Sequence, residues 1–371
     1  MKIAYLSGSL FPSVAANSIH VFKMGNAIAA NGHQLLLIGK KSPGQPANDQ
    51  TLEDFYGNKP AFKYELIDLS GKRLANVFYA HTAYKLTSKF NPDIYYGRHI
   101  ISCMYHVFKR KNTMVELHML PSFTGIKALL FKRFIKSKYL KKVVVISDQL
   151  KIDVVKAYGI DADRVIVAHD AADDVKPYNT KQLFNPEKFN VGYIGHLYPG
   201  KGMEIISELI PRIPSVHFNI IGGTDKDIAA WDAKLKENSN YTFHGMVSPK
   251  ETVNYRYAAD LLIAPYSKVV NSRAGNSIAA WMSPLKLFEY MAAGKPIITT
   301  DLPVIREVLT QNEDGILADP ENMNDWVEQI IRLKDDKALR EKLGAAARAE
   351  FVSKYTWTQR AKFIFTTEHT H

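Results

Sequence analysis

The sequence MSPLKLFEYMAAGKPIITT, residues 282–300, predicts a loop, a short helix and a strand in immediate succession. Ser283 is a good N-cap, and Pro284 suits the first helical position, where a missing N–H removes no hydrogen bond. Gly294 favours the left-handed conformation that ends a helix, and Pro296 prevents the helix from continuing. The β-branched residues that follow predict a strand. The helix is therefore short, and its start is abrupt.

The start of this helix predicts an anion site. The backbone N–H groups of Leu285, Lys286 and Leu287 have no partner within the helix and lie at the positive end of its dipole, beside the Lys286 ammonium. Such a site suits a phosphate. Glu289 shares a face with Lys286, and its carboxylate can accept hydrogen bonds from two ribose hydroxyls. The combination suggests a nucleotide diphosphate; the alternative is a capped amphipathic helix with a solvated Lys and Glu.

A second phosphate-binding loop is predicted at residues 190–202, NVGYIGHLYPGKG. A strand runs here into a turn that contains glycine, and Lys201 lies at the tip of that turn. Glycine lets a backbone approach phosphate oxygens closely. The sequence therefore places two phosphate-binding loops in one Rossmann-like half.

The order and spacing of motifs over nearly the whole chain resemble glycosyltransferase family 4, whose members are retaining glycosyltransferases of the GT-B architecture. Besides the two stretches above, the resemblance includes NGH at 31–33, ELH at 116–118, VVVISD at 143–148, GHL at 195–197, IIGG at 220–223, FHGMV at 243–247, ADL at 259–261 and DLPVIREV at 301–308. It implies two facing Rossmann-like parallel-sheet domains with an interdomain cleft.

Length and element order fit two domains as well. A chain of 371 residues exceeds one ordinary core, and strands alternate with helices in both halves, which predicts parallel sheets. With the resemblance, this predicts an acceptor-binding domain at 1–178, a linker at 179–188, a nucleotide-sugar-binding domain at 189–355 and a closing helix at 356–371 that returns to the first domain. Within the first domain we expect a mobile loop at 43–54 and a helix at 125–140.

The resemblance also implies roles for individual residues. Those implied to bind the donor nucleotide are Leu285, Lys286, Glu289, His196, Lys201, Met246 and Val247. Among them Glu289 would hold the ribose, Lys201 and Lys286 the diphosphate, and the turn at 245–247 the base. His118, at a predicted strand end, would hydrogen-bond a hydroxyl of the donor sugar and help to stabilise positive charge at the anomeric carbon. It is implied to be catalytic, as is Lys201 through the diphosphate. The alternative for His118 is a structural role, and Glu116 is expected to make a structural or acceptor-side contact.

Two positions depart from the family pattern. Family members usually have arginine where this chain has His196, a weaker and pH-dependent donor, so neutralisation of the diphosphate would depend more on Lys201 and Lys286. The family motif also has two glutamates. Glu289 matches the second, whereas Trp281 occupies the first position. The sequence leaves donor-sugar recognition open.

The loop after the first strand, residues 7–18, has Asn17 and Ser18 where the family often has a glycine-rich phosphate contact. A backbone N–H at these residues could bind phosphate or acceptor, and the alternative is a plain helix cap. Asp-x-Asp pairs occur at 161/163 and 225/227, both in polar loops. Because the resemblance implies a metal-independent enzyme, we predict no metal site and no cofactor.

The net charge of +11 lies in the first half, where residues 1–178 hold 25 Lys and Arg against 14 Asp and Glu. The densest basic run, at 127–142, contains Lys132, Arg133 and Lys136. An apolar stripe at helical spacing runs through it, formed by Ala128, Phe131, Ile135 and Tyr139, with Leu130 and Phe134 beside it. We predict that the stripe packs on the domain's own sheet and that the basic face contacts an anionic membrane. No motif for nucleic-acid recognition is found.

The sequence predicts a cytoplasmic protein, peripheral at the inner face of the membrane. It has no apolar run of about 18 residues and no signal peptide, and its one cysteine, Cys103, fits a reducing compartment. We therefore expect retaining transfer of a sugar from a nucleotide diphosphate donor to a hydroxyl of a glycan or lipid-linked acceptor, in bacterial polysaccharide or glycolipid synthesis. The alternatives are a catalytically impaired partner or sugar-nucleotide binder, and a nonhydrolysing sugar-nucleotide epimerase.

Overall fold

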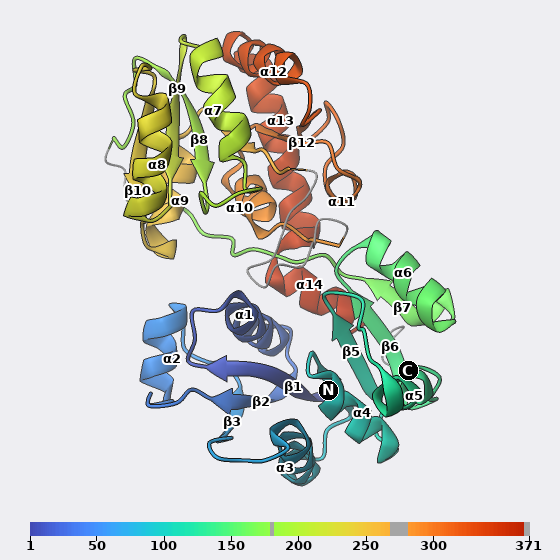
Figure 1. Cartoon of the computed structure of the whole chain (residues 1–371). Helices are drawn as coiled ribbons and strands as arrows, with labels where there is room; N and C mark the ends of the chain where they lie inside the picture. The colour runs from blue at the N-terminus through green and yellow to red at the C-terminus, as the bar shows by residue number, and fades with distance from the viewer. Residues whose placement is uncertain (179–181, 268–280, 367–371) are drawn as a thin grey trace. The chain divides into compact units, whose positions relative to one another are not determined.

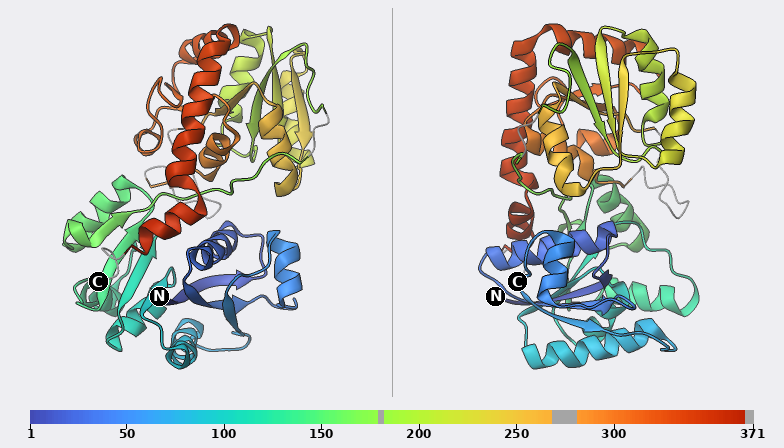
Figure 2. Two further views of the ribbon diagram at one scale, coloured as in Figure 1. Left: turned by 180° about the vertical axis from the view of Figure 1, so that it is seen from behind. Right: turned by 90° about the vertical axis from the view of Figure 1, so that its left-hand side faces the viewer.

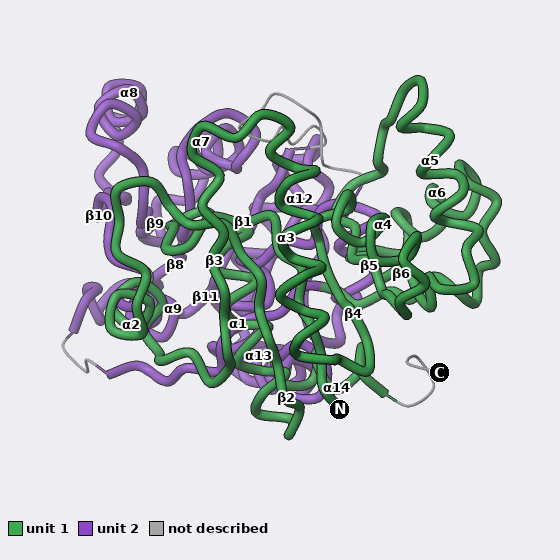
Figure 3. Tube along the Cα trace, turned by 90° about the horizontal axis from the view of Figure 1, so that it is seen from below, with its two compact units in different colours: residues 1–169, 357–371 green, residues 170–356 purple. Residues whose placement is uncertain are grey.

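The computed structural model describes residues 1–178, 182–267 and 281–366, which belong to two compact units (Figures 1 and 3). Unit 1 comprises residues 1–169 and 357–371, and unit 2 comprises residues 170–356. Each unit has one parallel sheet with helices on both faces (Figure 2). The predicted pair of parallel α/β domains is therefore confirmed.

The sheet of unit 1 has seven strands in the order β3-β2-β1-β4-β5-β6-β7, and all neighbours are parallel. The strand order reverses between β1 and β4. The elements are β1 (Lys2–Phe11), α1 (Ala16–Ala30), β2 (Gln34–Lys41), α2 (Asp49–Tyr56), β3 (Lys63–Ile67), α3 (Ala75–Phe90), β4 (Ile94–Gly97), α4 (Ile100–Phe108), β5 (Thr113–Leu117), α5 (Gly125–Ile135), β6 (Leu140–Val145), α6 (Asp148–Tyr158), the 3₁₀ turn Ala162–Arg164, β7 (Val165–Val167) and α14 (Trp357–Ile364).

Among its described residues, unit 2 has a sheet of six parallel strands in the order β10-β9-β8-β11-β12-β13, with the reversal between β8 and β11. The elements are β8 (Phe189–Ile194), α7 (Met203–Arg212), β9 (Val216–Ile221), α8 (Asp225–Leu235), β10 (Tyr241–Gly245), α9 (Pro249–Ala258), β11 (Leu261–Ala264), α10 (Leu285–Ala293), β12 (Ile297–Thr300), α11 (Pro303–Arg306), β13 (Ile316–Ala318), α12 (Met323–Asp335), α13 (Lys337–Glu350) and a π-helical turn, Phe351–Tyr355.

Both faces of the unit 2 sheet are buried, as strand β11 illustrates. Leu261 and Ile263 pack in one apolar cluster and Leu262 and Ala264 in the other. Successive strand residues point to opposite faces, so a continuous apolar strand fits a parallel sheet that is covered on both sides. The second cluster includes the buried face of α10, which fixes that helix on the sheet.

The predicted mobile loop at 43–54 is wrong in its second part, where α2 begins at Asp49. The Asn48 side chain caps this helix by accepting the N–H of Thr51 over 2.9 Å. The Tyr56 ring, at the other end of α2, stacks on Phe22 with centroids 4.3 Å apart. A cap and one buried aromatic ring thus order a segment whose composition resembles a loop.

The helix predicted at 125–140 is too long, because α5 ends at Ile135 and β6 begins at Leu140. The backbone at Leu140 pairs with Thr113 at the start of β5. The apolar residues Leu140 and Val143 are fully buried in the sheet rather than on a helix face. Sheet pairing therefore overrides the helical spacing at the end of this segment.

Unit 2 begins at Asp170, ahead of the linker predicted at 179–188. The N–H of Ala172 donates to the Tyr355 carbonyl over 3.0 Å, and Asp174 forms an ion pair with Arg348 at 2.8 Å. Phe184, within the predicted linker, is buried in the unit 2 core. These contacts attach the segment to unit 2.

Helix α14 lies in unit 1, where Asn31 donates to the Thr358 carbonyl over 2.9 Å.

Candidate active site

The carboxyl ends of β8, β9 and β10 meet at three glycines, Gly195, Gly222 and Gly245, which we call the glycine edge. The Gly195 N–H donates to the Ile221 carbonyl over 2.9 Å, and the Gly222 N–H donates to the Gly245 carbonyl over 2.7 Å. At Gly222 the φ angle is +121°, and a Cβ atom would lie 2.1 Å from the Gly195 oxygen. In open α/β sheets ligands bind beyond the carboxyl ends of strands, next to the reversal of strand order. Gly195, at the end of β8, is next to the reversal, and Gly222 and Gly245 continue the same edge of the sheet.

The loop that contains Lys201 is held by a buried tyrosine. The Tyr193 hydroxyl lies 2.7 Å from the carbonyl oxygens of both His196 and Lys201. Gly202 ends the loop with φ +118°, and a Cβ atom there would lie 2.5 Å from the Pro265 oxygen. Burial lowers the pKa of Lys201. The loop is therefore a fixed structure that holds a partly desolvated cation.

Lys286 approaches the same edge from the first turn of α10. Its ammonium lies 3.9 Å from the centroid of the Tyr193 ring, and a Cβ atom on Gly195 would be only 2.7 Å from the Lys286 Nζ. Burial, followed by the positive charge of Lys201, lowers the pKa of Lys286 to about 7, against a smaller opposite effect of Glu289. The two predicted phosphate ligands are thus neighbours, and each disfavours the charge of the other until an anion binds.

The start of α10 differs from the prediction in its cap. Pro284 is the N-cap residue, and the Ser283 hydroxyl instead accepts the N–H of Asp170 over 2.9 Å. Ser283 as N-cap is therefore wrong, because another backbone group uses its hydroxyl. The Leu287 N–H donates to the Pro284 carbonyl over 2.9 Å, which removes it from the predicted anion donors. Leu285 and Lys286 remain at the helix start, with Leu285 36% exposed.

Glu289, one turn after Lys286, forms an ion pair that the sequence analysis missed. The Arg256 Nη1 atom, from α9, lies 2.8 Å from the Glu289 Oε2 atom. The next residue, Tyr290, accepts the Ile194 N–H with its hydroxyl over 2.9 Å. Lys286, Glu289 and the end of β8 therefore form one connected group.

The remaining predicted nucleotide ligands lie at the ends of β8 and β10. His196 is exposed, and its ring stacks on Tyr198 with centroids 5.3 Å apart. Met246 follows Gly245 and is 68% exposed, whereas Val247 packs partly against the unit 2 core. An exposed apolar side chain beside the glycine edge suits the face of a base. Trp281 is half-buried.

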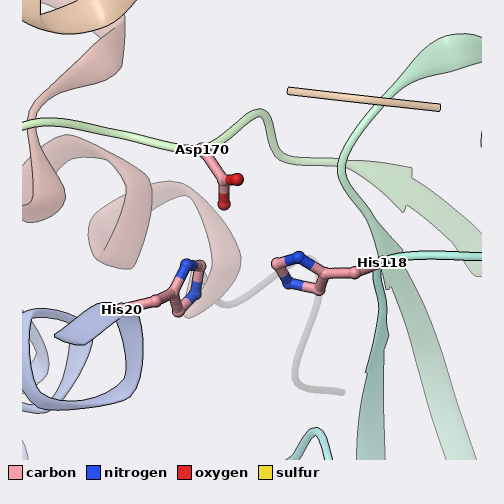
Figure 4. A group of neighbouring side chains, drawn as sticks. All are labelled: His20, His118 and Asp170. Carbon is pink, nitrogen blue, oxygen red and sulfur yellow. The ribbon is translucent and has the colours of Figure 1, made fainter. Parts of the chain in front are cut away.

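In unit 1, His118 follows the carboxyl end of β5 and lies beside a buried carboxylate. The His118 Nε2 atom is 2.5 Å from the Glu116 Oε1 atom, and the His20 Nε2 atom, from α1, is 3.2 Å from the same oxygen. The two imidazole rings face each other from these separate elements (Figure 4), with centroids 5.2 Å apart. His118 is partly exposed, whereas His20 is buried. The Glu116 carboxylate thus holds the imidazole of His118, the more exposed of the two rings.

Glu116 is fully buried and lies beside a buried arginine of α14. The Arg360 Nη2 atom lies 3.2 Å from the Glu116 Oε1 atom, and Arg360 also donates to the His169 and Ala168 carbonyls. Burial by itself raises the pKa of Glu116, but Arg360, His20 and the hydrogen bond from His118 hold that pKa well below its usual value. Glu116 is therefore an ionised structural carboxylate, in line with the structural role expected for it.

The first domain's predicted phosphate loop is only partly available. β1 extends to Phe11, and Ser18 lies inside α1, where it is 1% exposed. Its hydroxyl donates to the Leu10 carbonyl over 2.8 Å and its N–H to the Ala15 carbonyl over 2.9 Å. The Ser18 N–H is therefore used within α1 in this structure, and a role of Ser18 in ligand binding stays a prediction. Asn17 is exposed on the first turn of α1.

Two family models match consecutive parts of the chain, Glycosyltransferase Family 4 over residues 18–175 and Glycosyl transferases group 1 over residues 174–350. The chain belongs to glycosyltransferase family 4. An uncharacterized glycosyltransferase of Methanocaldococcus jannaschii, MJ1178, is 27% identical over 254 residues, which cover 67% of this chain and 66% of that protein. Two further curated relatives are matched over only 27% and 41% of their own lengths.

Solved structures of glycosyltransferases share the fold. A glycosyltransferase of Rickettsia africae ESF-5 superposes with a TM-score of 0.73 at 15% identity, over 98% of this chain and 96% of that one. Anabaena Alr3699/HepE, solved in complex with UDP, gives a TM-score of 0.71 at 16% identity, over 98% of both chains. Together with the two parallel sheets, these similarities identify the GT-B fold.

The basic helix of this family 4 member, α5, exposes Lys132, Arg133 and Lys136. Phe131, Phe134 and Ile135 of the predicted stripe region are buried, but Leu130 is 39% exposed and Tyr139 lies beyond the end of α5. Ile126 and Leu129 lie outside that stripe and are 74% and 68% exposed. Among the residues that the structure describes, no helix has the length and hydropathy needed to cross a membrane.

One residue of the two Asp-x-Asp pairs, Asp227, has a structural role. Asp227 accepts the Thr224 N–H over 3.1 Å and completes a capping box at the start of α8. Asp161 occupies the N-cap position of a 3₁₀ turn, but its side chain makes no capping hydrogen bond there. A carboxylate that caps a helix has fewer oxygen lone pairs for a cation. Asp227 therefore has a local structural role in the fold.

Proposed function

We propose that this chain transfers a sugar from a nucleotide diphosphate donor to a hydroxyl of a glycan or lipid-linked acceptor, with retention at the anomeric carbon and without a metal. The main observation in its support is the pair of neighbouring lysines, Lys201 and Lys286, at the glycine edge. Two cations beside backbone that only glycine permits suit the two phosphates of a nucleotide. The UDP complex of the Anabaena structure agrees with this class of ligand.

The donor nucleotide would bind to unit 2 through groups with separate tasks. Lys201, Lys286 and the N–H groups of Leu285 and Lys286 neutralise the diphosphate. Glu289 accepts hydrogen bonds from the ribose. The base lies against the turn at 245–247, and His196 adds a weaker donor near the phosphates. Because leaving-group charge develops on the diphosphate, these fixed cations stabilise the transition state more than the ground state.

His118 is the unit 1 residue proposed to act on the sugar. Its imidazole would donate or accept a hydrogen bond at a sugar hydroxyl and stabilise positive charge at the anomeric carbon. The departing phosphate takes the proton of the acceptor hydroxyl on the same face of the sugar, which forms the new glycosidic bond as the old one breaks. The remaining work of the protein is orientation and electrostatic stabilisation.

The acceptor is proposed to bind to the basic unit 1, at an anionic inner-leaflet surface. Lys132, Arg133 and Lys136 form the contact, since surface cations gain about 1 kcal/mol each from anionic lipid. Exposed Leu129 and Ile126 on the same helix add apolar contact area. This places the enzyme where lipid-linked acceptors are found.

The proposal is tested by thermal shift with UDP, GDP, ADP and CMP, each with and without magnesium. A ligand at a hundredfold excess over its Kd stabilises the native state by about 2.7 kcal/mol. We expect one diphosphate to raise Tm, with no effect of magnesium. No shift with any of them overturns the donor site, and a shift that requires magnesium overturns metal independence.

Incubation with the matching nucleotide sugar then separates the reaction classes. We expect slow release of free sugar with unchanged anomeric configuration, since water replaces the acceptor. A sugar nucleotide of altered stereochemistry with no transfer indicates an epimerase instead. Binding without any turnover, with and without acceptor, indicates an impaired partner protein.

A further inference from the structure

Arg256 is a buried cation whose charge is compensated by Glu289. Its side chain is 7% exposed, whereas that of Glu289 is 42% exposed, and Nη1 lies 2.8 Å from Oε2. A buried guanidinium needs a carboxylate or equivalent acceptor. The Oε2 atom of Glu289 is therefore occupied by Arg256, and a ligand approaches the solvent-exposed part of the carboxylate.

The side chains of residues on both sides of Arg256 are held by hydrogen bonds. Tyr257, next to Arg256, directs its hydroxyl to the Ala292 carbonyl in α10 at 3.4 Å, and Asn254 accepts the Tyr178 N–H over 3.1 Å. Helices α9 and α10, neighbours in Figure 1, are in contact. Arg256 therefore holds the Glu289 carboxylate from a fixed point rather than from a mobile loop.

We propose that Arg256 is a positioning residue for the ribose. By fixing Oε2, the guanidinium turns Oε1 of Glu289 toward the ligand. One carboxylate oxygen has two lone pairs, which suffice for the two vicinal hydroxyls of a ribose. This inference rests on the proposed donor site and adds a residue outside the sequence motif that defines it.

The inference predicts that Arg256 affects only ligands with ribose hydroxyls. Calorimetric titration of the wild-type protein with UDP, GDP and ADP, and with the 2′,3′-dideoxy form of each, gives the affinity due to the hydroxyls. Hydrogen bonds to a charged acceptor predict a preference of about 10- to 100-fold for the ribose form. In Arg256→Met we expect this preference to fall to within about threefold, with the dideoxy affinity unchanged.

Arg212→Met is the matched control, because Arg212 is an exposed arginine of the same unit in a surface pair with Glu208. It is expected to keep the wild-type preference. Arg256→Lys retains a cation and a donor, and we expect it to recover part of the preference. The unfolding midpoint of Arg256→Met reports whether that variant is folded. If it is not, Arg256→Lys still provides the test.

The outcomes separate this inference from the proposed function. A ribose preference that Glu289→Gln abolishes but Arg256→Met and Arg256→Lys retain overturns the role of Arg256 and leaves the donor site intact. Equal weakening of ribose and dideoxy ligands by Arg256→Met indicates a structural role only, which also overturns it. A wild type without ribose preference overturns the ribose role of Glu289 itself, and the inference with it.

Discussion

His118 and Glu116 form a carboxylate–imidazole couple in which Nε2 of the histidine lies 2.5 Å from Oε1 of the glutamate. A proton on Nε2 that faces a carboxylate fixes the tautomer, so that Nδ1 has the lone pair when the ring is neutral. The fully buried Glu116 is fixed in turn by Arg360 of α14. Segments that are far apart in the sequence thus set the orientation of the proposed catalytic imidazole.

The first prediction concerns the charge of Glu116. Glu116→Gln leaves Arg360 buried without its counter-charge, and removal of one partner of a buried pair typically costs about 3–5 kcal/mol. We expect a loss of this size in the free energy of unfolding, measured with urea at pH 7. Because the pKa of Glu116 in the folded protein is below its usual value, its contribution is complete above about pH 5 and is lost as the pH falls. The variant's stability should therefore depend less on pH below pH 5, and equal slopes for the two proteins would contradict the role given to this carboxylate.

The second prediction concerns the pKa of Lys286, which is about 7 in the free protein. A diphosphate binds the protonated ammonium, so affinity should be highest below pH 7 and fall by up to about tenfold per unit above it. Lys286→Arg stays charged throughout this range. The ratio of the two proteins' UDP or GDP affinities, measured by calorimetry from pH 6 to 9, should therefore change with pH. Titration of the nucleotide itself cancels in this ratio, and a constant ratio would place Lys286 away from the phosphates.

Much of the fold, and part of the site, follows from local sequence. The carboxyl ends of parallel strands share one edge, so the loop of Lys201 and the helix of Lys286 were expected in one half of the molecule, and both lie at the glycine edge. An ion pair between residues that are distant in the sequence produces no local sequence pattern. The sequence therefore does not predict the contacts of Arg256 and Arg360. The N-cap prediction for Ser283 is wrong because its hydroxyl accepts the Asp170 N–H, a bond that no local pattern identifies.

The third prediction tests the close backbone approach at the glycine edge. Gly222→Ala places a Cβ atom 2.1 Å from the Gly195 oxygen at φ +121°, so the variant must move the backbone. Gly32→Ala is the control, since Gly32 also has a positive φ, +80°, but no atom within 4 Å of its Cβ position. Left-handed strain alone costs about 1–2 kcal/mol. We expect Gly222→Ala to lose at least twice as much stability as Gly32→Ala in chemical denaturation, and similar losses would show that the edge can relax.

The fourth prediction concerns α5 as a membrane contact. Reversal of three exposed charges, Lys132→Glu, Arg133→Glu and Lys136→Glu, converts attraction to an anionic leaflet into repulsion. With about 1 kcal/mol per charge, neutralisation alone predicts a loss of roughly 100-fold in vesicle partitioning. The measurement is co-sedimentation with vesicles of phosphatidylglycerol and phosphatidylcholine at low and high salt.

The control is charge reversal at three lysines that are exposed on or beside α8 in unit 2, Lys226, Lys234 and Lys236. It makes the same change in net charge. If both triple variants lose binding equally, net charge accounts for the attraction and α5 has no specific role. The contact is supported if only the α5 variant loses binding and if high salt abolishes binding of the wild-type protein.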